Sequence, residues 1–98
     1  MAIDGKWDLT IQTPVGERMS TLDVSSSGGK LIGKQTGDQG TQDIENGAID
    51  GDEARWSIDI VVPMPMTLTF TGTVSGDTMA GTVQLGAFGE STFSGARA

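Results

Sequence analysis

The sequence predicts a single all-β domain over residues 1–98, an eight-stranded antiparallel meander that closes into an up-and-down barrel. Glycine occurs 15 times, and turn-forming residues recur at the spacing of about 8–12 residues that is typical of small β-barrels. Between the glycines, apolar residues alternate with Thr and Ser, most regularly over residues 66–74. Such alternation gives each strand one buried face and one solvated face.

The turn signals divide the chain into strands joined by short connections, so consecutive strands are expected to pair antiparallel. Gly76 begins a two-residue turn that sets Gly72 opposite Gly81 and Phe70 opposite Val83, with apolar residues or glycine on one face throughout. The expected strands are residues 5–12, 17–25, 30–36, 41–49, 53–62, 66–75, 78–85 and 90–96.

Two further packing details follow from the spacing. Ile44 and Ile49 have opposite parity in one strand, so a β-bulge near Asn46 is expected to turn both inward. If residues 63–65 form a three-residue loop, Trp56 lies beside Gly72, where inward glycines are expected to leave spare volume in the barrel.

Composition excludes several functions. The chain has no Cys and no His, which removes disulfides, thiolate metal sites and the commonest general base. A formal net charge of −7 with scattered basic residues argues against nucleic acid and anionic membranes as partners. No leader or membrane-spanning apolar run is visible, so a cytoplasmic location is expected if Met1 is the native start.

The carboxylates do not predict an active site or a metal site. Asp8, Asp59 and Glu90 lie on strands, and alternation points them outward, away from any cleft that would shift their pKa. We therefore expect no catalytic residue and no cofactor, and a hydrolase or isomerase that uses outward carboxylates is the least favoured interpretation. Turn chemistry accounts for the central acidic residues without a metal: Asp38, Asp43, Glu45, Asp50, Asp52 and Glu53.

Gly5 and Trp7 open the first strand as a Gly-x-Trp motif, and Arg97 follows the last strand. This combination resembles the calycin superfamily of lipocalins, fatty-acid-binding proteins and avidins, in which an arginine packs across the motif's indole at the closed end. The resemblance implies a lipocalin- or streptavidin-like barrel, although the Ω-loop and helix of lipocalins and an inward polar ring for a biotin-like ligand are missing. Residues 72–89 also resemble small bacterial β-modules, which occur alone or appended to hydrolases.

An eight-stranded barrel is just wide enough to be filled by its side chains or to hold one small ligand. The leading interpretation is a non-enzymatic barrel that binds a small apolar molecule, with this expected site: Trp56, Met66, Phe70, Met64, Gly72 and Gly81. The alternative is an interaction module, because the hairpin tip lacks polar side chains and would form a homodimer or dock on a larger enzyme. That tip comprises Val61, Val62, Pro63, Met64 and Pro65.

Overall fold

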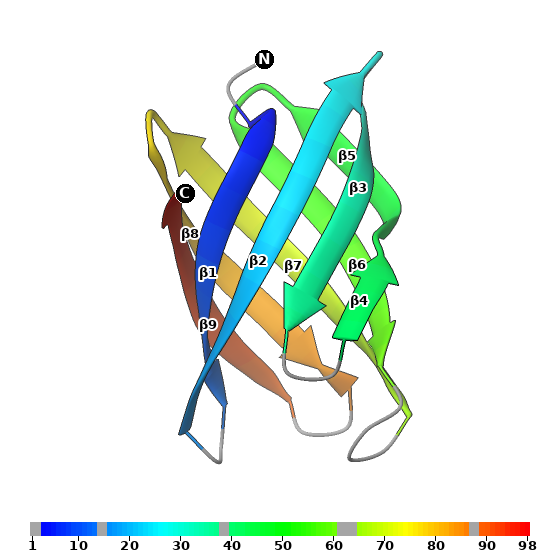
Figure 1. Ribbon diagram of the computed structural model, residues 1–98, viewed down its shortest axis with the longest axis vertical. Helices are drawn as coiled ribbons and strands as arrows, with labels where there is room; N and C mark the ends of the chain where they lie inside the picture. Colours follow the sequence, from blue (N-terminus) through cyan, green and yellow to red (C-terminus); the bar gives the residue numbers. More distant parts are fainter. Residues whose placement is uncertain (1–2, 14–15, 38–39, 61–64, 87–88) are drawn as a thin grey trace.

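The chain folds as an all-β barrel (Figure 1). The computed structural model describes residues 3–13, 16–37, 40–60, 65–86 and 89–98. Over these residues the strands are β1 (Gly5–Thr13), β2 (Gly16–Ser27), β3 (Lys30–Gly37), β4 (Gly40–Asp43), β5 (Glu45–Asp50), β6 (Glu53–Ile60), β7 (Met66–Ser75), β8 (Thr78–Leu85) and β9 (Glu90–Arg97).

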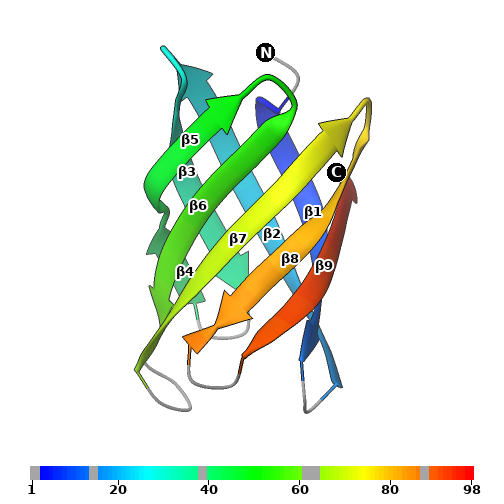
Figure 2. The same cartoon turned by 180° about the vertical axis from the view of Figure 1, so that it is seen from behind.

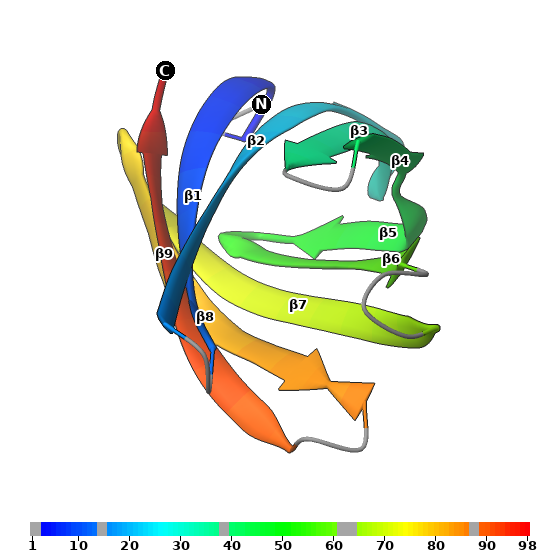
Figure 3. The same cartoon turned by 60° about the horizontal axis from the view of Figure 1, so that its bottom comes forward.

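The strands pair antiparallel in the order β2-β1-β9-β8-β7-β6-β5-β3-β4, and a further pairing of β2 with β3 closes the sheet. β4 and β5 both pair with β3, one after the other, so they share one position in a wall of eight. Views from behind and towards one end show this wall curving around the interior (Figures 2 and 3). The predicted eight-stranded up-and-down barrel is therefore confirmed.

The predicted register and bulge are also confirmed. Gly72 lies opposite Gly81 in the β7–β8 hairpin. The β5–β6 pairing shifts register around Asn46, which takes a φ of 53°. Because of this bulge, Ile49 is buried and Ile44 packs against the core, as the sequence predicted.

Apolar residues on the inward faces of the strands form most of the core of the barrel. Ile60 and Met66 are partly buried and pack against the fully buried set. That set is Ile3, Trp7, Leu9, Ile11, Leu22, Val24, Leu31, Ile49, Ala54, Trp56, Ile58, Leu68, Phe70, Val74, Met79, Val83, Leu85 and Phe93.

The predicted position of Trp56 beside Gly72 is wrong by two residues. Trp56 lies opposite Phe70, and Ala54 lies opposite Gly72. The error comes from the register of the hairpin, because Ile60 rather than Val62 is the partner of Met66. A shift of two residues moves all of β6 along β7 while the alternation of faces stays the same.

The spare volume expected beside Gly72 and Gly81 is occupied. A Cβ atom added to Gly72 would lie 2.8 Å from Cζ of Phe93, so the phenyl ring takes the space that the glycine leaves. A Cβ atom on Gly81 would collide with the carbonyl oxygen of Thr71 and lie 2.6 Å from Cα of Gly72. Gly72 lets the Phe93 ring approach the backbone of β7, and Gly81 lets β8 approach β7 closely where the sheet bends.

The N- and C-terminal segments lie towards the same end of the barrel, which we call the terminal end (Figure 1). The indole of Trp7 donates a hydrogen bond of 2.8 Å to the carbonyl oxygen of Ile3, which is buried. Arg97 lies over the Trp7 ring at 4.5 Å and donates to the carbonyl oxygen of Asp4 at 2.8 Å. Gly5 (φ 122°) leaves room for this guanidinium, because a Cβ there would lie 3.2 Å from Nη1 of Arg97.

The opposite end, which we call the loop end, is where four of the strand connections meet. β1 joins β2, β3 joins β4, β6 joins β7, and β8 joins β9 at this end, which faces the reader in Figure 3. At the terminal end, the guanidinium of Arg97 covers the ring of Trp7.

Candidate functional site

Three aromatic side chains fill the middle of the barrel. Trp56 stacks on Phe70 with ring centroids 5.1 Å apart and an angle of 8° between the planes. Phe93 presents its edge to both rings, at 5.8 Å from Trp56 and 5.2 Å from Phe70. All three are buried and form a solid floor, which the buried pair Ile58 and Leu68 separates from the loop end.

Gln35 is the inward polar residue that the sequence analysis missed. Its side chain is 2% exposed, accepts a hydrogen bond from Nε1 of Trp56 at 3.0 Å and donates one to Oγ of Ser20 at 3.1 Å. The strand alternation contained the signal, since Leu31, Gly33 and Gln35 share one parity and Leu31 is buried. A buried amide of this kind fixes the indole, because its loss would leave the Trp56 N–H without a partner.

Replacing Gln35 with methionine is expected to lower the free energy of unfolding by about 1–3 kcal/mol, the cost of an unsatisfied buried donor. Urea unfolding followed by circular dichroism measures the change. Gln42→Met is the matched control, because Gln42 lies opposite Gln35 in register and is only partly buried. In a Trp56→Phe background, the loss of stability caused by Gln35→Met should shrink. An undiminished loss there would contradict the role of Gln35 as the partner of the Trp56 N–H.

The inner face at the loop end carries both apolar and polar side chains. Ile60 and Met66 are paired at the end of the β6–β7 hairpin, and both are partly exposed. On the same face, β2 contributes Ser20, and β4, which lies near β6, contributes Gln42, both partly buried. Gln35 of β3 also faces inward, but it is buried.

The predicted ligand site is only partly brought together. Trp56 and Phe70 are in direct contact, but both are fully buried and belong to the floor. Met66 lies nearer the loop end and is partly exposed, whereas Gly72 and Gly81 are the close-approach positions described above. Met64 lies outside the described residues.

The predicted apolar tip is described only at its last residue. Pro65 is exposed at the start of β7. Val61, Val62, Pro63 and Met64 lie outside the described residues, and so do the last two residues of the expected strand 53–62.

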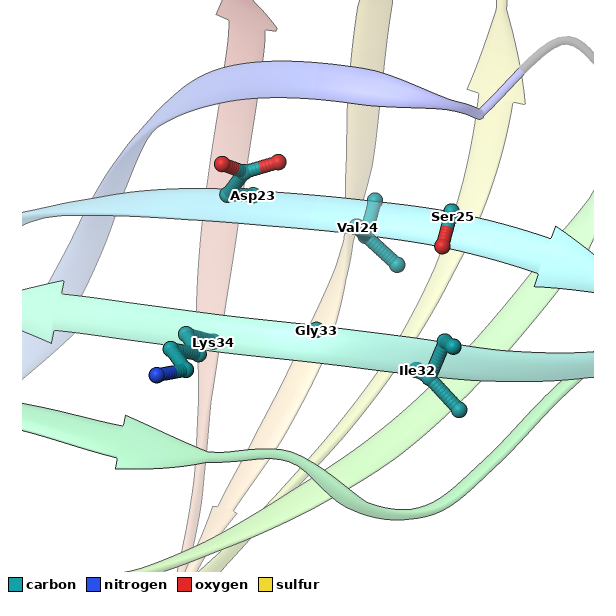
Figure 4. Close-up of a pocket in the computed structure, with 6 residues that line it drawn as sticks. All are labelled: Asp23, Val24, Ser25, Ile32, Gly33 and Lys34. Atoms are coloured by element: carbon teal, nitrogen blue, oxygen red, sulfur yellow. The ribbon is translucent and has the colours of Figure 1, made fainter.

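A shallow pocket lies on the outer surface between β2 and β3, away from the predicted site (Figure 4). It has a volume of ≈ 280 Å³. Its floor is the backbone around Gly33, where the two strands approach so closely that a Cβ atom would meet the carbonyl oxygen of Asp23. The lining residues are Asp23, Val24, Ser25, Ile32, Gly33 and Lys34.

The carboxylates point outward, as predicted, and one pair of them interacts. Asp8, Asp59 and Glu90 are exposed. A hydrogen bond to Asp59, together with the repulsion of its negative charge, raises the pKa of Glu45 on the outside of β5. Thr67 donates a hydrogen bond of 2.8 Å to Asp59, which lowers the pKa of Asp59. Within the described residues, no three acidic side chains come together as a metal site would need.

Replacing Glu45 with glutamine is expected to stabilise the fold at neutral pH. The raised pKa means that folded Glu45 holds its proton more tightly than the unfolded chain does, so the folded state loses relative stability as pH rises through that pKa. The gain from Glu45→Gln should therefore be largest at neutral pH and vanish in acid. Thermal melts from acidic to neutral pH measure it, with Glu90→Gln as the control for an exposed glutamate outside this pair.

Comparisons with known proteins do not place the chain in a family: no family model, no curated protein and no solved structure matches it. In the part of the chain that the structure describes, no helix is long and apolar enough to cross a membrane. The function must therefore be inferred from the fold and from the geometry of the barrel's two ends.

Proposed function

We propose that this protein is a non-enzymatic binding barrel that takes a small, mainly apolar molecule at the loop end. The observation that carries the proposal is the partly exposed pair Ile60 and Met66, which lies on the inner face at the loop end, above the buried pair Ile58 and Leu68. Accessible apolar side chains of this size are what a site for an apolar ligand needs. Methionine suits such a site, because its flexible thioether adapts to different shapes.

The polar side chains at the loop end narrow the class of ligand. Ser20 and Gln42, both partly buried, offer a hydroxyl group and an amide group on the same inner face. A molecule with an apolar body and one hydrogen-bonding group would match both the apolar pair and these groups, whereas a highly charged metabolite would leave the apolar pair unmatched. Trp56 lies below this site, beneath the buried Ile58 and Leu68, rather than in its wall.

A calycin-like origin belongs to the same proposal. The contact of Arg97 with Trp7, together with Gly5, supports it, since this is the arrangement that the Gly-x-Trp resemblance implies.

Titration of the protein with a fatty acid, a retinoid and a small aromatic, followed by tryptophan fluorescence, tests the proposal. We expect saturable quenching or a spectral shift with at least one of them, because the Trp56 ring lies beneath the site. Met66→Glu should abolish the response by placing a charge on the inner face. Met19→Glu makes the same change on the outer face, where Met19 is 62% exposed, and should leave binding intact.

Two results would count against the proposal. One is no response of the wild-type protein to any of the three ligand classes. The other is binding that survives Met66→Glu in a variant whose thermal melt shows that it is folded, because the ligand would then occupy another surface.

A further inference from the structure

The outer face of β4, β3, β2 and β1 carries four charged side chains at one level of the sheet. Asp43 lies beside Lys34, and Lys34 lies beside Asp23 on the next strand. Lys6 is the partner of Asp23 on the strand after that. The charges alternate in sign across these four neighbouring strands, and all four residues are exposed. In Figure 4, the side chains of Asp23 and Lys34 point away from each other, which leaves both available to an external partner.

Because the four charges alternate in sign, the row is complementary to a second copy of the same row that runs in the opposite direction. A two-fold axis parallel to the strands, running between β2 and β3, would turn a second copy over and reverse the row. Lys34 of each copy would then face Asp23 of the other copy, and Asp43 would face Lys6. A two-fold axis along the row would instead set every charge against itself, so electrostatics selects the first arrangement.

The shape of the same surface fits this axis. Ile32 is 63% exposed and lies opposite Ser25, one level along the strands from the charged row. Reversal by the two-fold axis sets Ile32 of one copy against the small Ser25 of the other. The pocket over Gly33 lies between the charged level and the Ile32 level, so it straddles the axis (Figure 4).

On the side of the charged row away from Ile32, the next level of outward side chains adds no repulsion between the two copies. Thr21 and Thr36 are paired in register and would face each other across the axis. Asp8 lies next to Thr21, and Thr41 lies next to Thr36, so the axis would set the carboxylate of Asp8 against the hydroxyl of Thr41. The only acidic side chain at this level of the four strands therefore meets a neutral partner.

We propose that this outer surface, centred on β2 and β3, is a homodimer interface in which two copies pair their charged rows about this two-fold axis. It is separate from the inner face at the loop end, where Ile60 and Met66 lie. The contacts are exposed charges around one apolar side chain on a convex wall, which is typical of small, transient interfaces. Association should therefore weaken as ionic strength rises, because salt screens exposed charge pairs.

Sedimentation velocity of four samples tests the interface: wild type, Asp23→Lys, Lys34→Asp, and an equal mixture of the two variants. Each variant alone would face like charges across the axis, twice per dimer, so its association should weaken at least about tenfold. In the mixture, the introduced lysine faces the introduced aspartate and Lys34 of one variant faces Asp23 of the other. A heterodimer should therefore form with close to wild-type affinity.

Arg55→Asp is the matched control, because it makes the same charge change as Lys34→Asp on β6, outside the charged row. It should leave self-association unchanged, and circular dichroism melts establish that each variant is folded. If a single variant unfolds, the double variant with Asp23→Lys and Lys34→Asp replaces it. This chain keeps opposite charges side by side in its own sheet and opposite each other across the axis. It should therefore dimerise. Wild-type protein that stays monomeric at high concentration and low salt, or a mixture no more associated than its components, would overturn the proposal.

Discussion

Replacing Phe93 with alanine is expected to lower the free energy of unfolding by about 3–5 kcal/mol, the usual cost of removing a buried aromatic ring. Phe93 is buried and presents its edge to both Trp56 and Phe70, so its removal empties the middle of the barrel. A loss of this size is a large part of the stability of a small domain. Urea unfolding followed by circular dichroism measures it.

Gly72 supplies the control for this prediction. A Cβ atom at Gly72 would lie 2.8 Å from Cζ of Phe93, so Gly72→Ala should destabilise the wild-type protein. In the Phe93→Ala background the ring is absent, and the added methyl group should cost much less. A double-mutant cycle with strictly additive effects would contradict our finding that the Phe93 ring occupies the space over Gly72.

Replacing Gly81 with alanine is expected to cost about 1–3 kcal/mol or more, because the collision is with backbone rather than with a movable side chain. The added methyl group would meet the carbonyl oxygen of Thr71 and Cα of Gly72, and relief of that collision would separate β8 from β7. Chemical denaturation measures the change.

Gly37→Ala is the matched substitution for Gly81→Ala. The nearest atom to a Cβ at Gly37 is Cβ of Ser20 at 3.5 Å, an ordinary van der Waals contact. Its effect should stay within about 0.5 kcal/mol, as for most surface changes. Equal losses at the two positions would mean that loss of glycine's flexibility, rather than strand contact, sets the cost.

The β7–β8 hairpin shows why much of this fold could be predicted from sequence. A two-residue turn at Gly76 fixes the register, and every pair along the hairpin then places apolar residues or glycine on one face. The register that the turn sets is also the register that the alternation of faces requires, so only one register satisfies both. Where the turn was ambiguous, between β6 and β7, alternation gave the correct face of Trp56 but not its partner.

The candidate site was less predictable than the fold. Alternation could place Met66 on the inner face, but how far each inward residue is exposed depends on its distance from the barrel end. Gln35 shares the parity of buried Leu31, yet a polar residue on a strand is ordinarily read as solvated. Only its contact with Trp56, 21 residues away in the chain, explains why it is buried.

The sequence by itself determined the all-β class, the strand order, the inward faces of its regular strands and the positions of the turn and bulge. These properties depend on residues close together in the chain, through alternation and turn chemistry. Only the tertiary structure decided that Phe93 fills the space over Gly72, that Gln35 holds Trp56, and that the charges on β1 to β4 form one alternating row. Such contacts depend on how distant strands are set against each other when the sheet closes, and no local pattern encodes that geometry.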